Sequence, residues 1–234
     1  MSGSCWATSG RQASGDRPTR PAAPTVSSPS SPDMFVAVAR TRQAENKREP
    51  ILQATWALIA EHGLRGLRIE NVAAQVGVAS SLVYYHFGSR AGLLAATMDY
   101  VDALSPSSDI IVSGSSESAY SRLERALLAE LGGSARVRAN AVVWNEFSAA
   151  AAFDPVLRER VCATSRRWAS AVADWIREGQ RDGSVRSDVD PREQAALLTA
   201  LLEGLNSRSL TGFIDRAEAR KLLAKALREG LAVA

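Results

Sequence analysis

The chain has 234 residues, of which 46% are hydrophobic and 6% aromatic, and its formal net charge is +3. This length and apolar content can build a sizeable core in one large or two small domains, and the abundance of alanine and leucine favours helices. The small net charge excludes a polycation that coats nucleic acid, so any affinity for DNA has to come from a local patch.

Residues 1–40 are rich in Ser, Pro, Thr and Gly, which predicts a disordered N-terminal extension. Basic residues then gather before the first helical pattern, at Arg40, Arg42, Lys47 and Arg48. They fit either a solvated helix start or a basic arm on DNA phosphates or in a minor groove.

The first helix is predicted over residues 47–62, where Gly63 ends an apolar stripe that includes Ile51, Leu52 and Ile59. The next stretch, residues 69–87, reads IENVAAQVGVASSLVYYHF. Two short helical patterns flank Gly77, at the point where a tight turn favours a residue without a Cβ. A helix, a glycine turn and a second helix of this length predict a helix-turn-helix, whose second helix lies in the major groove of DNA.

Residues 50–94 resemble the DNA-binding domain of the TetR family of bacterial transcriptional regulators over about a fifth of the chain. The matching landmarks are AEHG at 60–63, VAAQVGV at 72–78 and YYHFGSR at 84–90. The resemblance implies an all-α fold. A three-helix DNA-binding domain with its linking fourth helix would occupy residues 41–104, and a larger helical ligand-binding and dimerisation domain residues 105–234. It also makes Met34 a typical family start, so we expect residues 1–33 to be dispensable.

Several residues of the predicted DNA-binding domain are candidate DNA contacts. Ser80 and Ser81 are small enough to approach base edges, and Leu82 can lie against a thymine methyl. The resemblance implies contacts from positions that commonly touch phosphates or bases. The complete set of candidates is Arg68, Ser80, Ser81, Leu82, Tyr84, Tyr85, His86 and Arg90.

The same resemblance suggests which residues cap the helices and which bind phosphates. The family's usual serine is Ala79 here, so we expect Ser80 or Ser81 to cap the second helix of the helix-turn-helix, called the reading helix below. Arg68 stands where the family usually has a capping Thr or Ser, and its charge is available to a phosphate. Ser89 is expected to cap the fourth helix, with Arg90 in its first turn.

A Ser-rich stretch at residues 105–117 precedes further helical patterns at 120–131, 137–152, 155–180, 191–205 and 217–231. Paired leucines, such as Leu197-Leu198 and Leu222-Leu223, make two faces of the last two helices apolar. A second apolar face needs a partner, and the resemblance implies a homodimer through these helices. We expect Leu201 and Leu205 to lie in that interface. Residues 143–191 also resemble the BetI-type branch of effector domains.

The candidate ligand-binding residues are Trp144, Asn145, Phe147, Trp168 and Trp175. Aromatic side chains on central helices predict either ordinary core packing or a cavity with few charges, which suits an apolar or cationic effector.

No phosphate loop, paired-cysteine or zinc-protease motif accompanies these residues, so we expect no enzyme, no metal and no cofactor. Cys5 and Cys162 lie far apart, no apolar run approaches the roughly 20 residues of a membrane span, and no signal peptide is visible. The expected protein is cytoplasmic.

The function predicted from these features is that of a repressor that a small-molecule effector releases from double-stranded operator DNA. The alternatives are an activator or ligand-independent regulator of the same fold, or a helical partner-binding protein whose head has lost its DNA affinity.

Overall fold

The computed structural model describes residues 47–105, 107 and 117–233, and all of them belong to one packed unit. These residues form helices and turns, with an isolated β-bridge between Val185 and Ala232. The predicted all-α class is therefore confirmed. The predicted N-terminal extension, with Arg40 and Arg42, lies outside the described residues, as does most of the stretch 105–117.

The head of the molecule consists of α2 (Arg48–Gly66), α3 (Ile69–Val76) and α4 (Ser80–Phe87), and α5 (Arg90–Ala103) leads out of it. Gly77 adopts a left-handed conformation, with φ 68° and ψ 43°, and ends α3 as predicted. Gly63 is non-helical, with φ 71° and ψ 169°, so the regular part of α2 breaks where expected. One further turn follows this break and ends at Gly66.

The caps of the head helices differ in part from those expected. Ser89 caps α5 as predicted, because its Oγ accepts a hydrogen bond from the Gly92 N–H at 3.0 Å. The prediction for Ser80 or Ser81 is wrong, since the cap residue of α4 is Ala79 and Ser80 is already helical. A hydroxyl must precede the first helical residue to reach the N–H groups beyond it. Arg68 likewise starts α3 without a side-chain cap.

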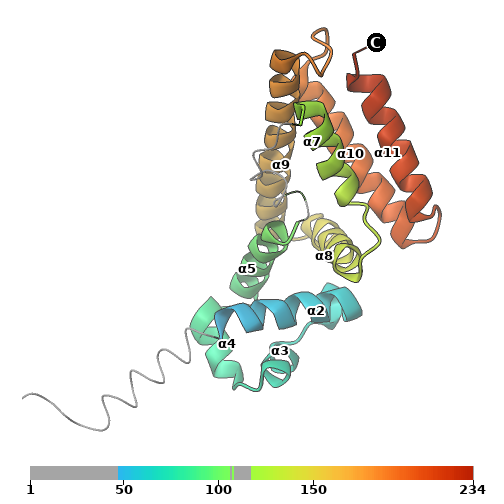
Figure 1. The fold of residues 1–234 in the computed structure, drawn as a ribbon. Helices are drawn as coiled ribbons and strands as arrows, with labels where there is room; N and C mark the ends of the chain where they lie inside the picture. The colour runs from blue at the N-terminus through green and yellow to red at the C-terminus, as the bar shows by residue number, and fades with distance from the viewer. Residues whose placement is uncertain (1–46, 106, 108–116, 234) are drawn as a thin grey trace, which may run out of the picture. The chain divides into compact units, whose positions relative to one another are not determined.

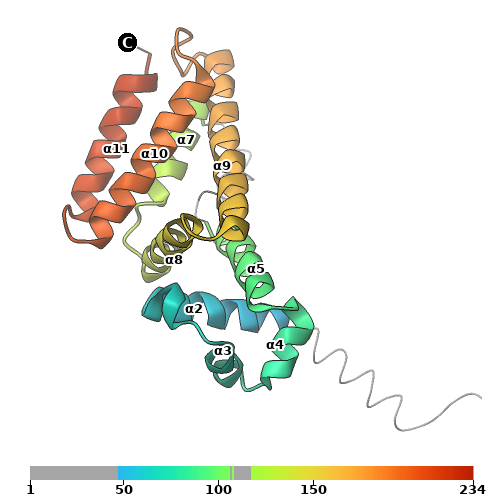
Figure 2. The same cartoon turned by 180° about the vertical axis from the view of Figure 1, so that it is seen from behind.

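The rest of the chain, here called the body, contains five described helices. They are α7 (Ala119–Ala129), α8 (Ala135–Ala151), α9 (Pro155–Asp182), α10 (Pro191–Leu210) and α11 (Arg216–Leu231). Asp154, Asp190 and Asp215 cap the last three, and proline occupies the first turn of α9 and α10. Figures 1 and 2 show α9, α10 and α11 side by side with α7, while α8 lies between this group and α2.

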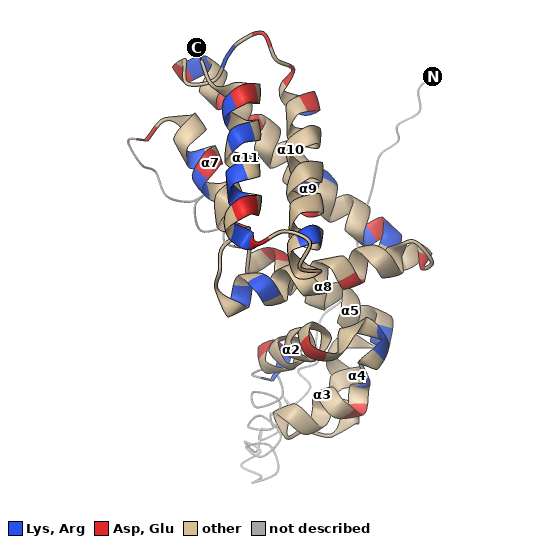
Figure 3. Ribbon diagram, turned by 90° about the vertical axis from the view of Figure 1, so that its right-hand side faces the viewer, with Lys and Arg blue, Asp and Glu red and all other residues tan. Residues whose placement is uncertain are grey.

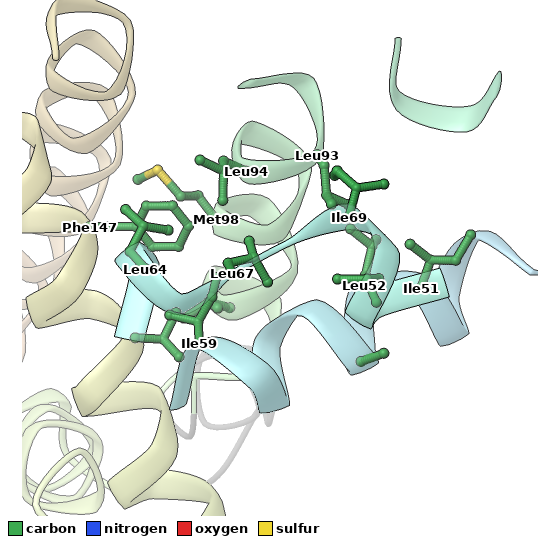
Figure 4. Packing of buried hydrophobic residues seen from close by; sticks show 14 of the residues in the cluster. Ile51, Leu52, Ile59, Leu64, Leu67, Ile69, Leu93, Leu94, Met98 and Phe147 are labelled. Carbon is green, nitrogen blue, oxygen red and sulfur yellow. The ribbon is translucent and has the colours of Figure 1, made fainter. Parts of the chain in front are cut away.

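Two hydrophobic clusters hold these helices together. The head core includes Ile51, Ile59 and Leu93, and it continues into α8 through Val143 and Phe147 (Figure 4). The body core joins α7, α9, α10 and α11. Each fully buried side chain of this size stabilises the fold by roughly 1.5–3 kcal/mol. Since α8 belongs to the head core, the predicted boundary between residues 104 and 105 is no break in packing.

The two leucines of each adjacent pair point to different sides of their helix. Leu198 and Leu223 are buried in the body core, whereas Leu197 and Leu222 are 57% and 43% exposed. Leu201 is partly buried, but Leu205 is only 4% exposed. Leu205 therefore belongs to the core of its own chain, and its expected place in a dimer interface is wrong. Figure 3 shows Lys and Arg together with Asp and Glu along α11, as on a solvated face.

Candidate nucleic-acid interface and pocket

The helix α4 has one face in the head core and one face open to solvent. Val83 is 1% exposed, and Phe87 packs against the head core. On the other side Tyr84 is 47% exposed and Tyr85 72%. Ser81 shares this exposed side. Because α4 is the second helix of a helix-turn-helix, the open face presents two tyrosines and a small hydroxyl where a reading helix meets DNA.

The remaining candidates on α3 and α4 are less uniform. Arg68 is exposed at the start of α3, and Ser80 and Leu82 are partly exposed. His86 is half-buried, and its Nε2 is buried without a hydrogen-bond partner among the described residues. Its ring meets the Tyr85 ring edge-on, with 5.4 Å between the centroids. A DNA contact through Nε2 would require the ring to turn, so Tyr85 is the better placed of the two.

Arg90 is exposed but already has a partner inside the head. Its Nη2 donates to the Leu64 carbonyl at 2.9 Å, which ties the end of α2 to the start of α5. The Leu64 N–H donates to Oε2 of Glu146 in α8 at 2.7 Å. The break at Gly63 frees this N–H from the helical pattern, and the carboxylate of Glu146 satisfies it. Leu64 thus joins α2 to α5 through its carbonyl and the head to α8 of the body through its N–H.

A pocket of about 330 Å³ lies among α5, α8, α9 and α10. Three of the predicted ligand-binding residues, Trp144, Asn145 and Trp168, line it. Phe147 does not, because it is fully buried in the head core. Trp175 lies behind Trp168, with its ring edge-on at 6.4 Å between centroids, and is only 8% exposed. Neither residue therefore lines the pocket, and each belongs to one of the two hydrophobic cores.

The pocket carries more charge than the sequence led us to expect. Its lining includes the carboxylates of Asp102, Glu130 and Glu203, and the guanidinium of Arg167. Arg167 pairs with Asp102 at 3.2 Å. Glu130 accepts from the Ser107 N–H at 3.2 Å and from the Ser105 hydroxyl. Three acids against one base leave an acidic pocket, so the prediction of few charges is wrong.

Glu203 is an acid of the pocket whose pKa is shifted by its surroundings. Burial raises its pKa above the usual 4.5, and a hydrogen bond from the Trp144 side chain opposes this shift. The residue as a whole remains accessible to solvent and lies in the pocket lining. A cation in the pocket would favour the charged form of this carboxylate.

Sequence reasoning missed both Glu203 and Asn140 as pocket residues. Glu203 had a visible signal, since it is the one charged residue in the apolar segment 195–205. Asn140 had a weaker one, as a single amide between alanines. The structure gives it a buried position in the pocket wall. Within the described ranges no group of potential metal ligands gathers, and no helix there is long and apolar enough to cross a membrane.

Comparison with known proteins identifies both halves of the chain. Residues 51–97 match the family model for bacterial regulatory proteins of the tetR family. Residues 119–232 match the model for the C-terminal domain of BetI-type transcriptional repressors. The HTH-type transcriptional regulator BetI of Burkholderia lata is 31% identical over 184 residues, which cover 76% of this chain and 90% of the relative.

Solved structures agree with these matches. A TetR-family regulator from Rhodococcus sp. superposes with a TM-score of 0.72 at 35% identity, over 80% of this chain and 100% of the other. A transcriptional regulator from Saccharomonospora viridis in complex with choline gives a TM-score of 0.72 at 26% identity, over 81% and 100% of the two chains. The chain belongs to the TetR family of DNA-binding transcriptional regulators and has a BetI-type C-terminal domain.

Proposed function

We propose that this regulator is a dimeric repressor that leaves its operator when a small quaternary-ammonium cation binds in the pocket among α5, α8, α9 and α10. The observation that carries the proposal is the joint presence of two tryptophans and three carboxylates in the lining of that pocket. Aromatic faces attract cations through their quadrupole, and a quaternary ammonium has little hydration to lose. The carboxylates add a favourable field.

The size and setting of the pocket support a small ligand. Its volume of about 330 Å³ lies at the lower end of ligand sites, which span roughly 300–1,000 Å³. The Saccharomonospora viridis relative was solved in complex with choline, a cation of this class. The family model for the C-terminal domain describes repressors, which favours repression over activation.

The homodimer in this proposal forms through α10 and α11. Leu197 and Leu222 expose large apolar side chains on these neighbouring helices, and burial of such side chains is a reason for two chains to associate. A two-fold dimer would present two copies of α4 to two half-sites of operator DNA.

Calorimetric titration with choline tests the proposal. The control is the neutral isostere dimethylbutanol, in which a carbon replaces the charged nitrogen. We expect choline to bind and the isostere to bind at least tenfold more weakly. Trp168→Ala should weaken the binding of choline by about two- to thirtyfold, because a cation–π contact is worth about 0.5–2 kcal/mol. Equal affinity for choline and the isostere would contradict the cationic class.

Operator binding distinguishes the alternatives. A duplex selected in vitro by the wild-type protein serves as the operator, and its affinity is measured with and without saturating choline. Release by choline is expected of the proposed repressor. Choline that binds but leaves operator affinity unchanged would favour the ligand-independent regulator.

A further inference from the structure

One residue of the pocket wall is bonded to the head at two points. Asn140 in α8 is 7% exposed and lines the pocket. Its Oδ1 accepts from the indole Nε1 of Trp56 in α2 at 2.8 Å. Its Nδ2 donates to the carbonyl of Leu104, the residue that ends α5, at 3.2 Å. A single carboxamide thus joins the pocket to the first helix of the head and to the helix that leaves it.

The other polar link between α8 and α2 does not reach the pocket. Glu146 binds the Leu64 N–H at 2.7 Å, but the pocket lining does not include it. Apolar contact also joins α8 to the head core, through Val143 and Phe147 and through Trp144, which lines the pocket as well. Such packing holds the helices together, but it has no single donor or acceptor that loses its partner when a side chain shifts, as a hydrogen bond has.

The two hydrogen bonds of Asn140 compete with anything that enters the pocket and needs that carboxamide. A carboxamide has two N–H donors and two acceptor lone pairs, but the bonds of Asn140 to two different helices hold the group in one position. A ligand that draws Asn140 inward leaves the partly buried N–H of Trp56 or the carbonyl of Leu104 without this partner, which is unfavourable. A ligand of this kind would couple the state of the pocket to the position of α2.

We propose that Asn140 is the positioning residue through which occupancy of the pocket changes the position of the reading head, with Trp56 as its receiving partner. The inference rests on the proposed function to the extent that a ligand binds this pocket. It goes further in naming the bond that is made in the DNA-binding state and lost in the ligand-bound state. A ligand shifts that equilibrium only by its differential affinity for the two states.

The test compares coupling ratios, defined as the operator Kd with saturating choline divided by the operator Kd without it. Trp56→Phe removes the indole N–H and keeps an aromatic ring at the contact with the head core. Asn140→Leu removes both ends of the carboxamide at similar volume. The matched control is Glu146→Leu, which removes a link between the same two helices away from the pocket.

For the wild type we expect a ratio within the usual range of allosteric coupling, about 5–150-fold. Trp56→Phe and Asn140→Leu should bring the ratio to within about threefold of one. Calorimetry should show that Trp56→Phe still binds choline, at the wild-type affinity or more tightly, because Trp56 does not line the pocket and the bond that choline has to break is absent. Glu146→Leu should alter operator affinity with and without choline alike, so that its ratio stays at the wild-type value. A full ratio in Trp56→Phe would overturn the inference and leave the proposed function intact.

A second experiment tests the coupling role of Asn140 without any ligand, and it applies also if choline does not bind. Failure of choline to bind would by itself contradict only the proposed effector class. Ala171→Phe fills the pocket from α9, and Ser165→Phe replaces it if the first variant fails to fold by circular dichroism. Filling should weaken operator binding at least fivefold in the otherwise native chain and less than twofold when combined with Trp56→Phe. An equal effect in both backgrounds, or none in either, would overturn the coupling role of Asn140.

Discussion

Gly63 sets the geometry of the head at the scale of a single residue. Its φ of 71° and ψ of 169° are accessible to glycine and strained for other residues. The break releases the Leu64 N–H to Glu146 and leaves the Leu64 carbonyl to Arg90. The sequence marked Gly63 as a helix end, but it held no sign that the end is a joint between head and body.

We predict that Gly63→Ala destabilises the protein by about 1–3 kcal/mol and weakens operator binding. A Cβ at this position would lie 3.0 Å from Oε2 of Glu146, in addition to the backbone strain. The melting temperature should fall by roughly 2–4 °C for each kcal/mol of stability lost. The control is Gly212→Ala, where φ is 77° and a Cβ would meet nothing within 4 Å. It should lower stability and leave operator affinity near wild type. Equal losses of operator affinity in both variants would contradict the role of the joint.

Arg90 has two possible roles, and its salt dependence separates them. We predict that Arg90→Ala lowers the slope of log affinity against log salt by about 0.9, the value for one phosphate contact on duplex DNA. The bond to Leu64 uses one of the five N–H donors of the guanidinium, which leaves others for a phosphate. Fluorescence anisotropy at several salt concentrations gives the slope. An unchanged slope with lower thermal stability would make Arg90 a structural residue of the head.

Glu203 gives the pocket a pH dependence. Burial raises its pKa above 4.5, and the charged form is the one that attracts a cation. Affinity for choline should therefore be full above the raised pKa and fall as the pH drops through it, in a window that lies above 4.5. Glu203→Gln keeps an acceptor for Trp144, removes this part of the pH dependence, and weakens choline by about two- to fivefold at neutral pH, as for a partly exposed charge pair. Calorimetric titrations across pH would contradict the assignment if the variant kept the wild-type profile.

At the scale of helices, periodicity predicted more than single residues did. The bounds of α4 and the glycine turn at Gly77 follow the pattern in the sequence. Paired leucines correctly predicted that one leucine of each pair lies outside the body core, but the exposed side of α11 is otherwise mainly charged. Phe147 and Trp175 were mistaken for wall residues because a stripe of aromatics has the same spacing whether it faces a core or a cavity. Which of the two it faces depends on the neighbouring helices, and a single helix does not record that.

The exposed leucines of α10 and α11 predict where the dimer forms. We expect the double variant Leu197→Glu with Leu222→Glu to be folded and monomeric by light scattering, and to lose most of its operator affinity. Both side chains are exposed in the single chain, so charge there should not disturb the body core. Leu205→Glu is the contrasting variant. It should unfold the protein, because it places a charge in the body core. A double variant that stays dimeric would place the interface elsewhere.

At the scale of the whole molecule, the proposed dimer turns pocket occupancy into a spacing between two reading helices. Each chain offers one α4, so the selected operator should be a near-palindrome with half-sites roughly 34 Å apart, about one turn of DNA, or a multiple of that distance. Inserting about five base pairs between the half-sites should abolish binding, because the second half-site then faces away. Inserting about ten should restore much of it only if the two heads can separate further without loss of contact.

Choline should act on the spacing between the two reading helices. If it changes the spacing of the heads, it should weaken binding to the paired half-sites far more than to a single half-site, which requires one head only. Binding to the two duplexes is compared at saturating choline, with Asn140→Leu as the control that keeps the dimer and loses the link. Equal weakening on both duplexes would mean that choline alters the reading surface of each head and not the distance between them.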